Sequence, residues 1–130
     1  YTVMTILNRL RSAESGSREL DVAIRTYEVG ATAEWQDYKQ DYAFHRDGSW
    51  VSIEPIEPAS TSIDAALALV ERMLPDSDYT TMQVRKEGMK LHRTALWIDG
   101  RWSKYCESAT APLAILTALF TALEAKDITP

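Results

Sequence analysis

The spacing of apolar residues predicts two helices at the beginning of the chain. The first has four apolar residues on one side: Val3, Ile6, Leu7 and Leu10. Residues 15–17, Ser-Gly-Ser, interrupt this pattern, and Ser17 is placed to cap a second helix over 18–29. Gly30 suits the left-handed residue that ends such a helix. The expected apolar side of the second helix consists of Leu20, Ala23, Ile24 and Tyr27.

A hairpin is predicted in the next part of the chain. Residues 31–40 show no regular period, and 39–41 are expected to form a loop. Asp47-Gly48 is a preferred dipeptide for a two-residue hairpin turn. Pro55 and Pro58 are expected to end the second strand. Pairing about the turn places Phe44 opposite Val51, Tyr42 opposite Ile53 and, on the reverse face, His45 opposite Trp50.

From residue 60 the pattern predicts a helix, a three-stranded meander and a second helix. Caps at 60–62 precede a helix whose stripe contains Ile63, Ala66, Leu67, Val70 and Met73. Strands are expected over 79–86, 89–98 and 101–107, with turns at 87–88 and 99–100. Thr110 caps the last helix, and Pro112 lies in its first turn. The buried side of this helix is expected to be Leu113, Leu116, Phe120 and Leu123.

Alternation divides the three strands into two faces, provided that both turns contain two residues. The face expected to pack under the helices contains Met82, Val84, Met89, Leu91, Ala95, Trp97, Trp102 and Cys106. Trp97 and Trp102 are expected to form a cross-strand pair. A one-residue bulge would exchange the later assignments. The other face is mixed and contains Thr81, Gln83, Arg85, Lys90, His92, Thr94, Leu96, Ile98, Arg101, Ser103 and Tyr105.

These elements predict an α+β fold in which an antiparallel sheet, a meander plus a hairpin, packs with helices. The chain has 130 residues, 45% of them hydrophobic and 25% charged, as expected for a single domain over 1–130. Its parts are N-terminal helices over 1–30, a hairpin-containing elaboration over 31–59 and a core over 60–126.

Charge and cysteine content narrow the classes of partner. The formal net charge is −5 and the isoelectric point is about 5.0, which disfavours nucleic acid and anionic membranes as partners. No apolar run approaches the roughly 18 residues that a membrane-spanning helix needs. The chain has one cysteine, Cys106, which cannot form an internal disulfide. A single unpaired cysteine is typical of a protein in a reducing cytoplasm.

No linear catalytic or metal-binding signature is present, so no cofactor and no metal site are expected. His45 and His92 lie on different predicted hairpins. Cys106 falls on the apolar face and is expected to be a small buried side chain rather than a reactive thiol.

The candidate ligand-binding residues are cationic and aromatic side chains on the mixed sheet face: Arg85, Lys90, His92, Arg101 and Tyr105. Arginine gives forked hydrogen bonds to anions, and tyrosine offers a stacking surface. The alternative is a solvated face, or salt bridges to Glu107 and the N-terminal helices. Trp35 and Trp50 are candidate interface anchors, with ordinary packing onto the sheet as the alternative.

Three segments carry a resemblance to a known family. Residues 60–70 (STSIDAALALV) and 109–119 (ATAPLAILTAL) resemble the two helices of the phage ABA-sandwich domain family, and 17–24 (SRELDVAI) is similar to the segment that opens many members. These are small proteins of tailed phages and prophages. The resemblance implies an alpha-beta-alpha sandwich and a phage or prophage origin, and it brings no catalytic residues.

The function expected from these observations is that of a non-enzymatic phage accessory protein that acts by binding in the bacterial cytoplasm. It would form homo-oligomers, and would capture an anionic molecule such as a nucleotide-like immune signal or block a host protein. One alternative is a double-stranded nucleic-acid-binding module, which has the same helix, three strands and helix, although 107–110 contains no lysine. Another is a small hydrolase built from His45, His92 and carboxylates.

Overall fold

The computed structural model of the chain describes residues 2–38, 40–51 and 56–128. Its helices are α1 (Val3–Ser12), α2 (Arg18–Val29), α3 (Ile63–Met73) and α4 (Ala111–Ile128). One antiparallel sheet contains β1 (Thr32–Gln36), β2 (Asp41–Arg46) and β3 (Ser49–Trp50). The other contains β4 (Asp78–Lys86), β5 (Met89–Ile98), β6 (Arg101–Trp102) and β7 (Cys106–Ser108). The α+β class, with sheets packed against helices, is confirmed.

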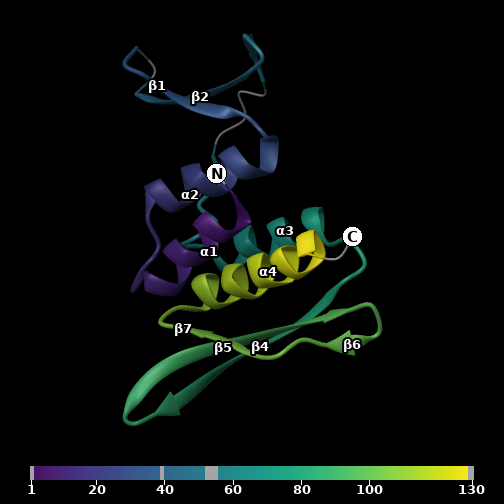
Figure 1. Cartoon of the computed structure of the whole chain (residues 1–130). Coiled ribbons are helices and arrows are strands. Elements are labelled where there is room, and N and C mark those ends of the chain that lie inside the picture. The colour runs from purple at the N-terminus through teal and green to yellow at the C-terminus, as the bar shows by residue number, and fades with distance from the viewer. Residues whose placement is uncertain (1, 39, 52–55, 129–130) are drawn as a thin grey trace.

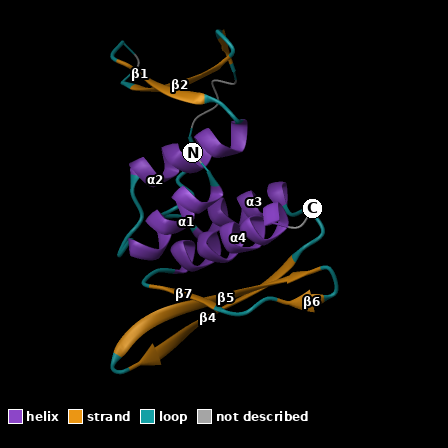
Figure 2. Ribbon diagram, viewed as in Figure 1, coloured by secondary structure: helices purple, strands orange, loops and turns teal. Residues whose placement is uncertain are grey.

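The helices lie between the two sheets (Figure 1). Helix α4 packs on β5 and β7 and is covered on its other sides by α1 and α3, while α2 packs on α1 and supports the β1–β2–β3 sheet. The layers therefore run from sheet to helices to sheet (Figure 2), an order different from the alpha-beta-alpha sandwich that the resemblance implied. The outer face of the four-stranded sheet carries no helix from the described part of the chain.

Side-chain caps begin the helices where the sequence predicts them. The Ser17 hydroxyl accepts a hydrogen bond from the Leu20 N–H at 3.2 Å, and Thr110 accepts one from Leu113 at 3.3 Å. Ser62 caps α3 in the same way. Gly30 ends α2 with φ 64° and ψ 37°, a left-handed conformation that costs glycine little.

The main core surrounds α4, whose residues 111–120 are all buried. A helix that is apolar on every side is stable only where it is enclosed, and α1, α3 and the four-stranded sheet enclose it. The predicted apolar side of α1 is confirmed as fully buried. In α3 the prediction is wrong at Ile63, which is 46% exposed, because the helix turns Leu69 toward the core instead.

A buried polar contact joins α2 to the segment before α3. Ser60 donates its backbone N–H to Asp21 Oδ1 at 2.8 Å, and its hydroxyl lies 2.7 Å from the same oxygen. The hydroxyl also accepts the Ser17 N–H at 2.9 Å. Gly16 lies so close that a Cβ there would overlap the Ser60 carbonyl group. We refer to Gly16, Ser17, Asp21 and Ser60 as the Ser60 junction.

The three-stranded sheet contains a strand that the sequence analysis missed. Strand β1 occupies half of the segment 31–40, which shows no regular period, and it pairs with β2. The predicted hairpin is confirmed in its described part, where His45 pairs with Trp50 and the Val51 N–H donates to the Phe44 carbonyl. The predicted positions of Ile53 and Pro55 lie outside the described residues. A second, smaller core beneath this sheet consists of Val22, Phe44 and Ile56.

Both tight turns of the four-stranded sheet are confirmed. Lys86 pairs with Met89 across the first, and Ile98 pairs with Arg101 across the second. The last predicted strand is wrong in one respect, because it is divided into β6 and β7 by the irregular residues 103–105. Trp97 pairs with Trp102 but Thr94 pairs with Cys106, so β6–β7 has one residue more than β5 in this interval. This bulge places Cys106 on the sheet face opposite to that of Trp102.

The prediction of which sheet face forms the core is also wrong. Thr94 and Leu96 are fully buried on the face toward α4, whereas Trp97 and Trp102 are 38% and 49% exposed on the outer face. The two indoles do form the expected pair, with ring centroids 5.3 Å apart. The register places the following residues, which the sequence predicts on the core face, on the outer face instead: Met82, Val84, Met89, Leu91, Ala95, Trp97 and Trp102.

The length of the β4–β5 hairpin explains this inversion. The hairpin extends beyond the helices, which cover only part of its length (Figure 1). A few apolar residues near the middle and end of β5 are therefore enough to form the inner face, and Arg85 and Lys90 on that same face remain exposed near the tip. Counting apolar residues over whole strands favours the wrong face when only part of each strand is covered.

Candidate functional site

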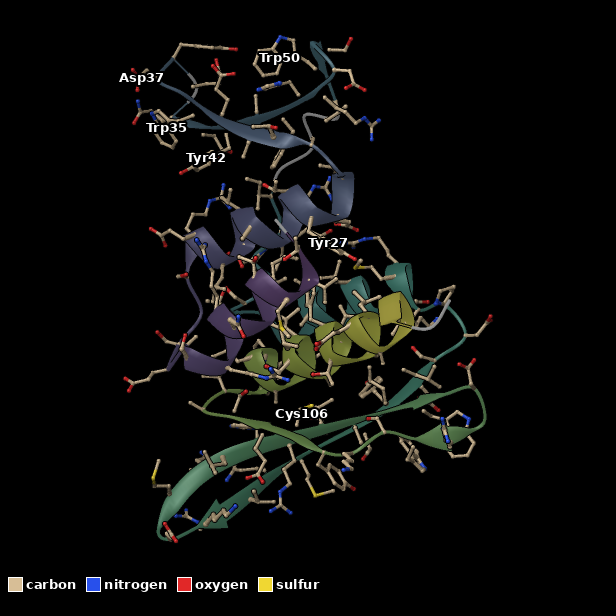
Figure 3. The ribbon with its side chains drawn as sticks, viewed as in Figure 1. Tyr27, Trp35, Asp37, Tyr42, Trp50 and Cys106 are labelled. Atoms are coloured by element: carbon tan, nitrogen blue, oxygen red, sulfur yellow. The ribbon has the colours of Figure 1, made fainter. Side chains whose placement is uncertain are left out.

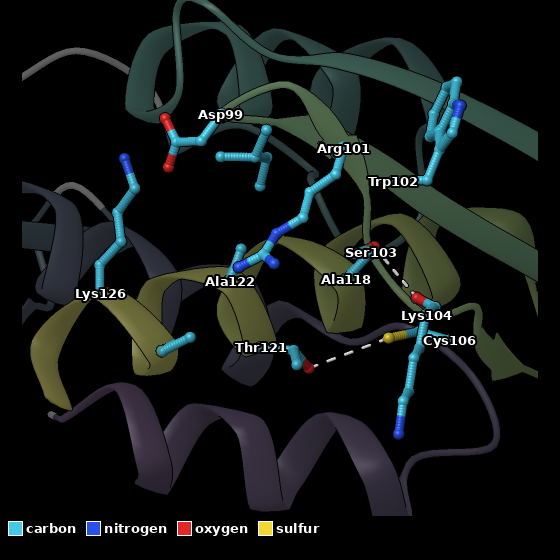
Figure 4. A pocket seen from close by; sticks show the side chains of 12 residues that line it. Asp99, Arg101, Trp102, Ser103, Lys104, Cys106, Ala118, Thr121, Ala122 and Lys126 are labelled. Carbon is cyan, nitrogen blue, oxygen red and sulfur yellow. Dashed lines mark hydrogen bonds between the residues drawn. The ribbon is translucent and has the colours of Figure 1, made fainter. Parts of the chain in front are cut away.

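A cleft lies between the β5–β6 turn and the second half of α4. It has a volume of about 610 Å³, within the range typical of small-molecule sites. Ile98, Ala118 and Ala122 form its apolar floor. The polar residues that line it are Asp99, Arg101, Ser103, Lys104, Thr121 and Lys126 (Figure 4).

The turn at 99–100 directs Arg101 into this cleft. Asp99 and Gly100 both have positive φ, 53° and 83°, which reverses the chain within two residues. Arg101 pairs with Ile98 and therefore shares the inner face, toward α4. In Figure 4 its guanidinium extends over Ala122, whereas the indole of Trp102 points away from the cleft.

Small side chains on α4 leave the space open. Ala118 and Ala122 are one helical turn apart and lie on the side of α4 that faces Arg101. Lys126 follows after another turn, and its side chain extends toward Asp99 at the rim (Figure 4). The cleft thus has a narrow apolar floor with charged groups around it.

The charges at the cleft are opposite in sign to the chain as a whole. Arg101, Lys104 and Lys126 outnumber Asp99, so the lining carries a formal charge of +2 in a protein of net charge −5. None of these three cations forms an ion pair within residues 2–38, 40–51 and 56–128. A net positive charge held in a concave site raises the local concentration of anions.

Cys106 forms part of the cleft wall, close to α4 (Figure 3). Its thiol donates to Thr121 Oγ1 at 3.9 Å. Burial raises the pKa of this thiol, and the Thr121 hydrogen bond and the charge of Arg11 only partly oppose that effect. The sulfur is therefore protonated at neutral pH, the form that is a poor nucleophile.

The structure divides the predicted ligand-binding set. Arg85, Lys90, His92 and Arg101 share the inner face of the sheet by register, as expected, but α4 covers the middle of that face. At roughly 3.3 Å per residue, Lys90 and the residue paired with Arg101 lie about 26 Å apart along β5. Tyr105 lies in the irregular link and is 50% exposed. Only Arg101 from this set lines the cleft.

Sequence reasoning missed Lys104 and Lys126 as site residues. Lys104 lies in the link between β6 and β7, where no period could show its direction. The spacing of Ala118, Ala122 and Lys126 at intervals of four is a signal that could have been found, because it places two small residues and a cation along one side of a helix.

The candidate interface residues Trp35 and Trp50 are both exposed but lie on opposite faces of their sheet (Figure 3). Trp35 packs edge-on against Tyr42, and its indole N–H donates to Asp37 Oδ1 at 2.7 Å. Trp50 packs edge-on against His45. The two indoles therefore do not form one continuous patch.

Within the described residues, no group of three or more His, Cys, Asp or Glu side chains is arranged to hold a metal ion. The helices described here include none that is both long and apolar enough to cross a membrane. No protein-family model matches the chain, and no curated protein matches it.

Proposed function

We propose that this protein is a non-enzymatic binding protein that captures a small organic anion in the cleft between the β5–β6 turn and α4. Following the family resemblance, its setting is a phage or prophage accessory role, and the ligand class is nucleotide-like. The cleft supports this proposal, and the resemblance gives its biological direction.

The observation that carries the proposal is the arrangement of Arg101, Lys104 and Lys126 around the apolar floor formed by Ala118 and Ala122. Arginine can donate two parallel hydrogen bonds to a phosphate group, and lysine adds a mobile positive charge. An apolar floor with small side chains suits the flat, weakly polar part of a ligand. A phosphorylated molecule that also carries a planar ring matches both features.

Binding is favoured over catalysis by the state of the thiol in the cleft. Cys106 lines the cleft, and its raised pKa keeps it protonated. Ser103 and Thr121 also line the cleft, but Thr121 donates its hydroxyl to the Thr117 carbonyl at 2.7 Å. The arrangement therefore supplies recognition groups more readily than an activated nucleophile.

Isothermal titration calorimetry with cyclic nucleotides, ADP-ribose derivatives and nucleoside phosphates tests the proposal. We expect at least one of these anions to bind and its affinity to fall with added salt. Removing a charge-assisted hydrogen bond costs about 1.5–3 kcal/mol, so Arg101→Ala is expected to weaken binding by roughly 10- to 150-fold. Lys126→Ala is expected to weaken it less, because lysine is not a forked donor.

Arg85→Ala is the matched control, since it removes the same charge from the same sheet face outside the cleft. It is expected to change the affinity less than threefold, the effect of net charge alone. Absence of heat with every anion would remove the proposal. Equal losses in Arg85→Ala and Arg101→Ala would show that the binding is nonspecific attraction, or that it takes place elsewhere.

A further inference from the structure

Strand β4 forms an open edge of the four-stranded sheet. The strand order is β4–β5–β6, with β7 also on β5, so no described strand lies on the far side of β4. Seven of its nine residues are exposed, and its main contacts are with β5 and α4. A long edge strand presents unpaired N–H and C=O groups to which another strand can bind.

The turn after β4 determines which residues present those groups. Glu87 and Gly88 have φ values of 53° and 79°, typical of a turn in which the Met89 N–H donates to the Lys86 carbonyl. Lys86 is therefore hydrogen-bonded to β5, and so is every second residue before it. The backbone groups of the remaining residues, Tyr79, Thr81, Gln83 and Arg85, point to the open edge.

The sequence of β4 is complementary to itself in the antiparallel direction. A two-fold axis at Met82 brings the acidic end of one strand to the basic end of the other. It also pairs residues whose backbone groups both point to the open edge, as an antiparallel ladder requires. The resulting pairs are Asp78 with Lys86, Tyr79 with Arg85, Thr80 with Val84, Thr81 with Gln83, and Met82 with Met82.

We propose that two copies of this chain associate through their β4 edges, joining two four-stranded sheets into one continuous sheet. In this dimer the Asp78 carboxylate of each copy faces the Lys86 ammonium group of the other. The Tyr79 ring of each copy likewise faces the Arg85 guanidinium of the other. Each interface is the same patch on both copies, which gives a closed dimer.

The central part of the edge has none of the features that prevent strand addition. Residues 79–84 contain neither proline nor a charged side chain, and the charges at the ends are the ones that the pairing matches. One outward group is already used, because the Tyr79 N–H donates to Asp78 Oδ1 at 2.8 Å. The hydrogen bonds of the dimer therefore centre on Thr81 and Gln83 of each copy.

Light scattering on the purified chain measures the association directly. We expect a mass of twice 14.7 kDa at micromolar concentrations. Gln83→Pro removes an N–H that points to the open edge and not to β5, so it is expected to restore the monomer mass. Gln83→Ala keeps the N–H and is expected to remain dimeric. A monomer in the unmodified chain, or a dimer unaffected by Gln83→Pro, would overturn the proposal.

A crosslinking experiment does not depend on how the proline variant folds. The Met82 residues face each other on the axis as a non-hydrogen-bonded pair, where the Cα separation of about 4.5 Å permits a disulfide. Met82→Cys in a Cys106→Ser background is expected to form a covalent dimer under mild oxidation. Met89→Cys in the same background is more exposed than Met82→Cys (61% against 40% for the methionines) but lies off the axis, and it should not crosslink. Equal crosslinking at both positions contradicts the predicted register.

Charge exchange tests the same register in solution. Asp78→Lys alone and Lys86→Asp alone each place like charges opposite one another, so each is expected to increase the monomer fraction. The double variant restores opposite charges and should restore the dimer. Because Lys86 also lies 3.8 Å from Glu107 within the chain, the recovery in the double variant is the decisive comparison. Additive weakening in the double variant would refute the Asp78–Lys86 pairing.

Discussion

Replacing Ser60 by alanine should destabilise the fold far more than the loss of one hydroxyl group would at the surface. Ser60 is 1% exposed, and its hydroxyl serves two partners at once, the Asp21 carboxylate and the Ser17 N–H. The substitution leaves Asp21 with the Ser60 backbone N–H. It removes the acceptor of the Ser17 N–H completely.

The magnitude follows from these two losses. A hydrogen bond to a charged group contributes about 1.5–3 kcal/mol, and an unsatisfied buried N–H costs about 1–3 kcal/mol. Because these losses share one site and water can partly enter it, we expect the free energy of unfolding to fall by about 2–4 kcal/mol. A chain of 130 residues has an unfolding entropy of about 0.27 kcal/mol/K, so Tm should fall by about 7–15 °C.

Thermal unfolding followed by circular dichroism measures this effect. Ser12→Ala is the matched control, because the Ser12 hydroxyl is exposed and donates to carbonyl groups of its own helix. Its Tm should change by less than about 2 °C. If Ser60→Ala lowers Tm no more than Ser12→Ala does, the Ser60 junction does not stabilise the contact between α2 and the segment before α3. That result would refute the stabilising role given to the Ser60 hydroxyl.

Two further predictions concern ionisable groups. Burial raises the pKa of Glu28, but hydrogen bonds and charges from Arg72 and Arg25 outweigh this effect and hold the pKa below the ordinary 4.5. The ionised Glu28 carboxylate therefore stabilises the folded chain at neutral pH, and this contribution is lost as the pH falls below about 4.5. Thermal unfolding of Glu28→Gln between about pH 6 and pH 3 should show a smaller decrease in Tm than the unmodified chain, and parallel curves would contradict this. Since burial raises the pKa of Cys106, iodoacetamide should alkylate it more slowly at pH 8 in the folded chain than in urea, whereas equal rates would show an exposed thiolate.

Local signals in the sequence predicted the elements well because each depends on a few neighbouring residues. Ser17 and Thr110 cap helices where a hydroxyl can accept an N–H three residues later, and Gly30 ends α2 because it adopts positive φ. The glycine turns after Lys86 and Ile98 set the strand register for the same reason. These features need no knowledge of the rest of the fold.

The candidate cleft depends on contacts between distant segments, and local patterns carry no information about them. Arg101 could be placed on a sheet face, but the helix opposite it lies about twenty residues later in the chain. The position of α4 decides both which face is covered and which cations gather. The bulge before Cys106 adds one residue whose effect on side-chain direction cannot be inferred from alternation alone.

The burial of residues 111–120 of α4 on every side has a consequence for the order of folding. In the described part of the chain, the elements that enclose this helix precede it in the sequence, and α1 lies about a hundred positions earlier. During synthesis the ribosome therefore releases α1, α3 and the β4–β5 hairpin before the segment that completes their core exists. The nascent chain must keep these apolar surfaces from aggregating until α4 emerges, and the final collapse closes a very long loop. Contacts between residues so distant in the sequence are typical of slow folding.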